Sequence, residues 1–203
     1  MTPERRLLRH EERQAQLLRA AATAFAGSGF SGTSMDDVAA EAGVTRLIIY
    51  RHFGSKEILY RSVLERVTDR LQSEFGSGIR AGTDAARGWI VASMLTVARE
   101  NPDGFRLLTV HAAREPGFAA LHDQWWARAV GAAETLVGDS IADPALRAWA
   151  TRTIVAYLVD AVLNWLDTGT AGRDPEFVQQ AHDGLVAMYL AWADPASSVV
   201  RRR

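Results

Sequence analysis

Cysteine is absent from the 203-residue sequence, which excludes disulfides, thiol catalysis and cysteine-ligated zinc. Long apolar runs are absent too, since stretches such as residues 154–159 are far too short to cross a bilayer. The charged N-terminus lacks the apolar core of a signal peptide. We therefore expect a cytoplasmic protein that neither spans nor binds a membrane, and we expect no metal site and no cofactor.

A strong overall charge is also missing, because the net charge at neutral pH is only −1. Residues 1–56 hold eight basic and six acidic side chains, a charge of +2, which leaves −3 for the remainder. This is the direction expected of a DNA-binding head on an acidic body. It disfavours an architectural DNA-binding protein without an effector, because such proteins are basic throughout.

Helical signals dominate, and no stretch shows the sustained two-residue alternation of a strand. Capping residues stand directly ahead of proline at 101–102, 143–144 and 174–175, where proline suits the first helical turn. Glycines at positions 27, 29, 43, 76, 78 and 169 indicate where helices end. We predict an all-α fold of about nine helices, over residues 3–27, 34–41, 45–52, 55–75, 83–100, 102–114, 117–140, 144–168 and 175–193.

Residues 34–53 predict a helix-turn-helix. Ser34 and Asp37 have the spacing of a capping box at the start of its first helix. Ala39 is small enough for a second helix to cross closely, and Gly43 suits a sharp turn with positive φ.

The second helix of this motif divides into two faces. With Ile49 turned inward, Leu47 and Arg51 point almost directly away at 100° per residue. Arg46 lies in the first turn and Tyr50 on a flank. A short helix that exposes arginine, leucine and tyrosine suits the major groove of DNA.

Three spaced motifs run through this N-terminal part: Phe25-x4-Phe30-x2-Thr33, then Val38-Ala39-x2-Ala42-Gly43-Val44-Thr45, then Ile49-Tyr50-x-His52-Phe53-x-Ser55-Lys56-Glu57-x-Leu59. Together they resemble the signature of the TetR family of transcriptional regulators. The resemblance implies an all-α homodimer with a three-helix DNA-binding head and a divergent helical effector domain. We accordingly expect a DNA-binding domain over residues 1–54 and a ligand-binding and dimerisation domain over residues 55–203.

The resemblance also implies roles for individual positions. Thr33 or Ser34, together with Tyr50, His52 and Lys56, match phosphate-contacting positions, and Arg46 and Leu47 match base-reading positions. The sequence departs from the common pattern at Leu47 and Ile48, where small residues or threonine are usual. The expected DNA-binding set is Thr33, Ser34, Thr45, Arg46, Leu47, Tyr50, Arg51, His52 and Lys56.

The last two predicted helices favour a dimer interface. Residues 146–166 are apolar nearly all round, and one helix face alone is used by the helix's own domain. Residues 177–192 carry a second apolar stripe. Two such helices from each chain would form a four-helix interface, as the resemblance also implies. The alternative is a monomer with a thick single core.

Aromatic side chains in the C-terminal part also predict an effector pocket, although such residues can equally belong to the core. Trp125 and Trp126 are adjacent and cannot both face one neighbouring helix. His111 lies among apolar residues and needs a partner, for which Glu115 is a candidate; the pair could otherwise bind a metal, but two ligands make a poor site. The predicted pocket residues are Phe105, Leu108, His111, Trp125, Trp126 and Tyr157.

Taken together, these patterns predict a ligand-responsive transcriptional regulator. We expect it to bind a palindromic double-stranded DNA operator as a homodimer, to act as a repressor and to be released by a small, mainly apolar effector. An all-α enzyme is the alternative of a different class, and no phosphate-binding glycine loop or catalytic cluster supports it.

Overall fold

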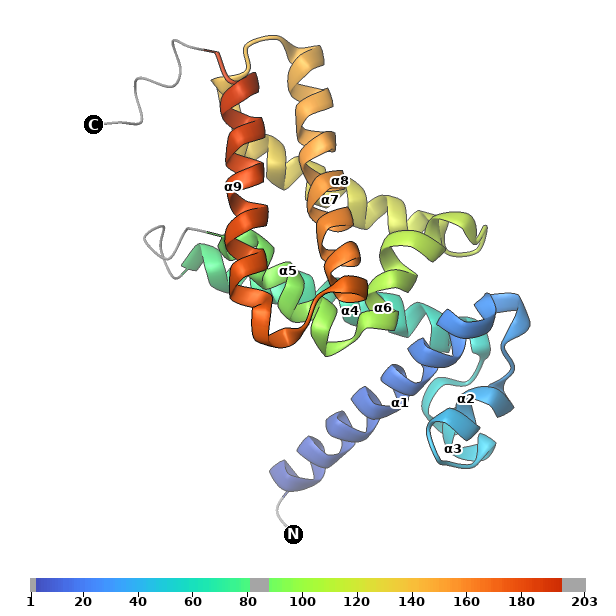
Figure 1. The fold of residues 1–203 in the computed structure, drawn as a ribbon. Coiled ribbons are helices and arrows are strands. Elements are labelled where there is room, and N and C mark those ends of the chain that lie inside the picture. Colours follow the sequence, from blue (N-terminus) through green and yellow to red (C-terminus); the bar gives the residue numbers. More distant parts are fainter. Residues whose placement is uncertain (1–2, 81–87, 195–203) are drawn as a thin grey trace. The chain divides into compact units, whose positions relative to one another are not determined.

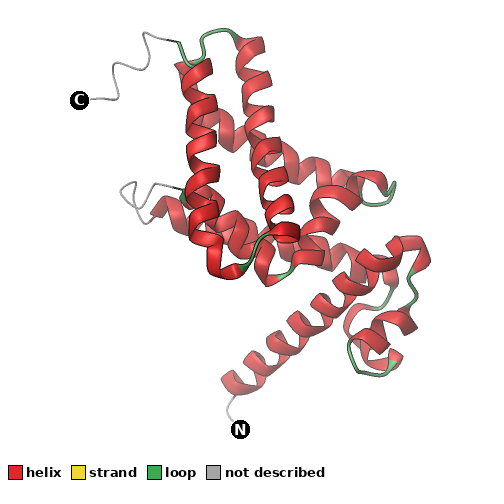
Figure 2. Ribbon diagram, in the orientation of Figure 1, coloured by secondary structure: helices red, strands yellow, loops and turns green. Residues whose placement is uncertain are grey.

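The computed structural model describes residues 3–80 and 88–194, with side-chain detail for residues 11–76 and 88–194. In this part of the chain all regular structure is helical, with nine α-helices and no strand (Figure 2). The all-α class predicted from the sequence is therefore confirmed. In chain order the helices are α1 (Pro3–Gly32), α2 (Met35–Glu41), α3 (Arg46–Phe53), α4 (Lys56–Arg80), α5 (Trp89–Glu100), α6 (Pro102–Arg106), α7 (Ala119–Val137), α8 (Pro144–Thr168) and α9 (Asp174–Trp192) (Figure 1).

Of the three helices predicted to begin at a capped proline, α6 and α8 do so, whereas α9 begins at Asp174 without a side-chain cap. The Asn101 side chain accepts a hydrogen bond from the Gly104 N–H at the start of α6. The Asp143 carboxylate accepts from the N–H groups of Ala145 and Leu146 at the start of α8. These bonds satisfy N–H groups that have no partner inside a first helical turn. The predicted start of the fifth helix, at residue 83, lies outside the described residues.

Helix ends were predicted less well. Helix α1 continues past residue 27 to Gly32, and its break comes at Gly29, which has φ 72°. Helix α4 continues past residue 75 to Arg80, because glycine weakens a helix without forbidding it.

The segment predicted as one helix over 102–114 contains three kinds of helix. Helix α6 ends at Arg106, a π-helical turn follows over Leu107–His111, and a 3₁₀ turn covers Ala112–Arg114. The Ala112 N–H closes the π turn on the carbonyl of Leu107, five residues earlier. The next carbonyl, that of Leu108, accepts a hydrogen bond from His122 Nδ1 at 3.0 Å.

By packing, the chain divides into two compact units. Unit 1 comprises residues 1–72 and 97–122, and unit 2 comprises residues 73–96 and 123–203. Helices α4, α5 and α7 contribute residues to both units. Unit 1 thus groups the helix-turn-helix with α6, which packs against α1. This division describes packing, and the boundary of the DNA-binding domain at residue 54 stays a prediction.

The core of unit 1 contains a cluster of aromatic rings. Phe25 and Tyr60 are fully buried and meet edge to face at 4.9 Å. Phe118, from the connection that leads into α7, lies 4.4 Å from the Tyr60 ring and 5.0 Å from that of Phe30. The rings join the end of α1 to the start of α4 and to the α7 connection, three segments far apart in sequence.

In unit 2, α8 and α9 lie side by side (Figure 1). The Tyr157 hydroxyl donates to the Ala181 carbonyl at 3.1 Å. A Cβ at Gly184 would lie 2.5 Å from that hydroxyl, so glycine is what lets the two helices approach here. Where α8 ends and α9 begins, Trp165 stacks on Phe177 at 4.9 Å and its indole N–H donates to Asp174 at 2.7 Å.

Candidate nucleic-acid interface

The first helix of the motif, α2, begins with a complete capping box. The Ser34 hydroxyl accepts a hydrogen bond from the Asp37 N–H at 3.1 Å, and the Asp37 carboxylate accepts from the Ser34 N–H at 2.8 Å. The Ser34 hydroxyl also donates to Asp37 Oδ2 at 2.7 Å, and the bonds that this carboxylate accepts from the Ser34 N–H and hydroxyl lower the pKa of Asp37. The predicted cap is confirmed, and it fixes the direction in which the chain enters α2.

The turn between α2 and α3 follows the Schellman pattern. The Gly43 N–H donates to the Ala40 carbonyl at 3.1 Å, and the Val44 N–H donates to the Ala39 carbonyl at 3.0 Å. Gly43 has φ 63°, a conformation that residues with a Cβ rarely adopt. The turn therefore ends α2 at Glu41, and α3 begins five residues later at Arg46.

Helix α3 has one buried and one exposed face, as the 100° spacing predicts. Ile49 is fully buried and Phe53 nearly so. Leu47, by contrast, is 67% exposed, the largest value among the exposed large apolar side chains of the described residues. Arg51 is exposed as well. The buried face fixes α3 against the rest of unit 1 and leaves its other face open.

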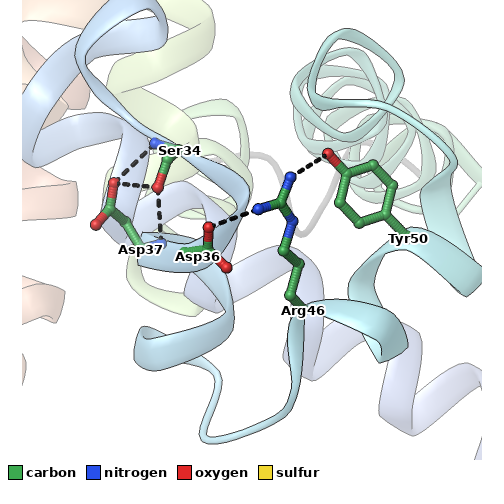
Figure 3. A network of polar contacts seen from close by, with 5 residues as sticks. All are labelled: Ser34, Asp36, Asp37, Arg46 and Tyr50. Carbon is green, nitrogen blue, oxygen red and sulfur yellow. Dashed lines mark hydrogen bonds and ion pairs between the residues drawn. The ribbon is translucent and has the colours of Figure 1, made fainter.

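A polar network ties the start of α3 to the start of α2 (Figure 3). Arg46 Nη1 donates to Asp36 Oδ2 at 2.8 Å, and Arg46 Nη2 donates to the Tyr50 hydroxyl at 3.1 Å. The guanidinium carbon lies 5.1 Å from the centre of the Tyr50 ring. The hydrogen bond to Tyr50, followed by the charge of Asp36, raises the pKa of Arg46. No role for Asp36 was predicted from the sequence, because only the folded arrangement of two helices brings it to Arg46.

Two of the expected phosphate-contacting residues have contacts inside the protein. Thr33 is buried, and its hydroxyl donates to the carbonyls of Gly29 at 2.7 Å and Ala24 at 3.1 Å. Lys56 Nζ donates to the carbonyls of Phe30 at 2.9 Å and Thr33 at 3.0 Å, and it lies 4.5 Å from the centre of the Phe30 ring. Both side chains thus donate hydrogen bonds to backbone carbonyls at the end of α1, where the helix is interrupted at Gly29. No local sequence pattern indicates this role.

The remaining members of the expected DNA-binding set lie on or beside α3. Thr45 is exposed at its N-terminus, and Tyr50 is 37% exposed. His52 is half-buried, with its ring 6.0 Å from that of Phe53. The structure places the whole expected set in unit 1, on α3 and its N-cap, at the end of α1, at the N-cap of α2 and at the start of α4. Contact of these residues with DNA stays a prediction.

The expected effector residues fall in both units. Phe105 and Leu108 are buried in unit 1, and His111 of the same unit is half-buried. Trp125, Trp126 and Tyr157 belong to unit 2; the first is buried and the other two are half-buried. That these six residues line one pocket stays a prediction.

Metal sites and membrane-spanning helices were also considered for the described residues. No group of three or more histidine, aspartate and glutamate side chains in this part of the chain could hold a metal ion. Nor does any helix of the described segments have both the length and the apolar character needed to span a membrane.

Comparison with known sequences matches this region to a family. The pattern of the family described as "Bacterial regulatory proteins, tetR family" covers residues 17–63. The HTH-type transcriptional activator FasR of Mycolicibacterium smegmatis is 33% identical over 168 residues, which are 79% of this chain and 75% of the relative. The HTH-type transcriptional repressor SCO4008 of Streptomyces coelicolor is 27% identical over 76% of this chain and 78% of its own length.

Solved structures share the fold over most of the chain. A TetR-like transcriptional regulator from Rhodococcus sp. RHA1 superposes with a TM-score of 0.71 at 19% identity, covering 88% of this chain and 93% of that one. A second transcriptional regulator from the same organism gives a TM-score of 0.67 at 23% identity over 89% and 97%. The likeness therefore extends beyond the helix-turn-helix to the helices that follow it.

Proposed function

The chain belongs to the TetR family and is a DNA-binding transcriptional regulator of that non-enzymatic family, and from this we propose that α3 reads the major groove of an operator. One observation carries the proposal. Helix α3 buries Ile49 and Phe53 while it presents Arg46, Leu47 and Tyr50 outward from a capped, sharply turned helix pair.

Each exposed side chain has a chemistry that suits DNA. Arg46 can form paired hydrogen bonds to guanine, and an exposed leucine can contact the methyl group of thymine. Tyr50 accepts a hydrogen bond from Arg46, so its own hydroxyl hydrogen remains to donate to a phosphate. Ser34, Thr45, Arg51, His52 and Lys56 surround this face as proposed backbone contacts, whereas the buried Thr33 acts through the shape of the α1 end.

The test of DNA reading is selection of bound duplexes from a random library by the full chain, followed by Arg46→Ala. We expect this substitution to cost roughly 1–3 kcal/mol and to relax preference at one base pair. Thr45→Ala, an exposed neighbour without a long donor, is the matched control and should preserve that preference. Unchanged affinity of Arg46→Ala for the selected sequence would contradict the assignment.

We propose that α8 and α9 form the interface of a homodimer. Exposed apolar side chains lie in the first half of α8 (Leu146, Trp149) and the second half of α9 (Val186, Leu190). The Trp149 and Trp192 rings meet at 4.7 Å, which makes these halves neighbours. A two-fold dimer presents two copies of α3, so the operator is expected to be an inverted repeat with half-sites one DNA turn, or a multiple of it, apart.

We further propose that a small, mainly apolar effector releases the dimer from DNA, with repression as the output. Relatives include proteins named as an activator and as a repressor, so the direction requires a test of its own. The proposed route is α4, which begins directly after α3 and has residues in both units. A hundredfold loss of operator affinity requires about 2.7 kcal/mol of coupling, within the usual allosteric range.

Tryptophan fluorescence tests the proposed effector site. A compound that releases the wild type from DNA should quench the emission of Trp125 and Trp126. The double substitution Trp125→Phe, Trp126→Phe should lose that signal, while Trp165→Phe, at the α8–α9 contact, should keep it. Full quenching in the double variant would place the pocket elsewhere.

We propose that the regulator acts in the cytoplasm, with the DNA that it binds.

A further inference from the structure

An acidic side chain stands in the surface that we propose faces DNA. Asp36 lies in the first turn of α2, and its side chain is 63% exposed beside that of Arg46, which is 55% exposed. A carboxylate there repels the phosphates of any duplex that α3 approaches. The start of α2 does not require it, because Asp37 already supplies the capping carboxylate. Its position therefore needs another explanation.

The contacts of Arg46 supply that explanation. Asp36 and the Tyr50 hydroxyl hold the guanidinium from two sides, at 2.8 Å and 3.1 Å (Figure 3), and the guanidinium carbon lies 5.1 Å from the centre of the Tyr50 ring. An exposed ion pair of this kind contributes little to folding. It does restrict a long, flexible side chain, and it uses only two of the five N–H donors of arginine. Three donors thus remain for a base, on a group whose orientation is already set.

We infer that Asp36 is a specificity-determining positioning residue, which orients Arg46 for base reading and offsets the charge that would otherwise draw Arg46 to any phosphate. The inference rests on the proposed function of α3. It has two opposite consequences: Asp36 weakens binding to DNA in general, and it strengthens the preference for the correct base pair. The first effect follows from the charge of any exposed carboxylate there, whereas a residue that only stabilised α2 would not set the preference at one base pair.

The experiment compares Asp36→Ala with Asp37→Ala in the full chain. Both substitutions remove one negative charge from the same helix end; only the first removes a contact of Arg46, and only the second removes the capping carboxylate of α2. Binding is measured to the duplex selected by the wild type, to single-base variants of it and to an unrelated duplex, each at several salt concentrations. Thermal melting confirms that each variant is folded.

For Asp36→Ala we expect binding to the unrelated duplex to tighten about threefold to tenfold, with a salt slope steeper by about one. Discrimination at the base pair that Arg46→Ala affects should fall about tenfold, and Asp36→Ala combined with Arg46→Ala should lose no more than Arg46→Ala alone. Asp37→Ala should retain this discrimination. Tyr50→Phe removes the second anchor of Arg46 and should weaken discrimination at the same base pair by a smaller factor.

Three outcomes would overturn the inference or the function on which it rests, and they are distinguishable. Wild-type discrimination in Asp36→Ala overturns the inference and leaves the proposed function intact. An equal loss at every base pair, or an equal loss in Asp37→Ala, assigns Asp36 a merely structural role and also overturns it. Failure of the wild type to select any sequence overturns the proposed function itself.

Discussion

The outer face of α3 and the patch on α8 and α9 both expose apolar side chains, but the residues around these side chains differ. On α3 the exposed Leu47 stands beside Arg46 and Tyr50, whose polar groups bond to each other and to α2. On α8 and α9 the exposed residues are leucine, valine and tryptophan, gathered in neighbouring halves of two helices. A single apolar side chain among oriented hydrogen-bond donors suits DNA, which offers phosphates and thymine methyl groups. An apolar patch suits contact with another protein surface.

The largest expected effect tests whether the α8–α9 patch is a protein interface, as the comparison of the two surfaces implies. Trp149→Glu combined with Leu190→Glu places two charges in the proposed dimer contact, and we expect the dissociation constant to rise at least a thousandfold, about 4 kcal/mol. Analytical ultracentrifugation measures the change. Leu136→Glu is the matched control, because Leu136 on α7 is 54% exposed and Leu190 is 58% exposed. Equal dissociation in the control, or an intact dimer in the double variant, would contradict the assignment.

Beside the α3 surface, polar contacts at single atoms also hold the end of α1, and Lys56 at the start of α4 is the side chain that tests them. Lys56→Met keeps the bulk of the side chain but leaves the carbonyls of Phe30 and Thr33 without their charged donor. We expect a loss of about 2 kcal/mol of unfolding free energy, measured by urea denaturation. Arg51→Met, an exposed charge in the same region, should change stability by less than about 0.5 kcal/mol.

Salt dependence of DNA binding separates this structural role of Lys56 from a phosphate contact. A direct contact would lower the salt slope by about one for every duplex. If Lys56→Met keeps both the stability and the salt slope of the wild type, neither role holds.

The turn that orients α3 depends on backbone conformation, and two glycines test this with opposite signs. Gly43 has φ 63°, and no heavy atom beyond its two chain neighbours lies within 4 Å of the place that a Cβ would take. Gly43→Ala therefore introduces backbone strain alone, about 1 kcal/mol destabilising. Gly27, within the regular part of α1, also has open space around it. Gly27→Ala should therefore stabilise by about 0.5–1 kcal/mol. A stabilising Gly43→Ala would show that the turn relaxes.

The smallest expected effect at neutral pH concerns Tyr60, whose buried hydroxyl has no hydrogen-bond partner among the residues that the structure describes. Tyr60→Phe should be neutral or stabilise by up to about 1 kcal/mol at pH 7. Burial, and then the charge of Glu115, raises the pKa of Tyr60 to about 12. Because the unfolded chain ionises near pH 10, the wild type should lose stability relative to Tyr60→Phe as the pH rises from 10 to about 12, by roughly 1–2 kcal/mol.

Tyr189→Phe is the control for that experiment, since it removes a hydroxyl that donates to Ser140 Oγ at 2.7 Å. It should destabilise by about 1 kcal/mol at pH 7. Chemical denaturation at pH 7 and between pH 10 and 12 measures both variants. A stability difference between wild type and Tyr60→Phe that does not change with pH would mean that the hydroxyl reaches water.

Features set by neighbouring residues could be predicted from the sequence. The starts of α6 and α8, the capping box of Ser34 and Asp37, and the inward turn of Ile49 depend on residues within one or two helical turns of each other. Helix class and the faces of α3 follow from the same short-range rules.

Features made by distant segments could not be predicted. Lys56 bonds to carbonyls 23 and 26 residues away, and Arg46 bonds to an aspartate 10 residues away on another helix. Nothing in the composition of residues 107–111 marks a π turn, which depends on where the surrounding helices hold the chain. For α3 the sequence therefore indicated which residues face outward, but it did not indicate the partners that orient Arg46, nor that Thr33 is buried.

That π turn has a consequence for how relatives should be aligned. Its hydrogen bond spans five residues, from Leu107 to Ala112, where an α-helix spans four, so it accommodates one additional residue between two otherwise regular segments. A relative with one residue fewer there could run through as plain α-helix and keep both flanks in register. Without a gap, each residue beyond 111 would be paired with a neighbour that points about 100° away around the helix. Alignments of this family should therefore permit a single-residue gap within residues 107–111, or side chains that occupy equivalent places will be scored as unrelated.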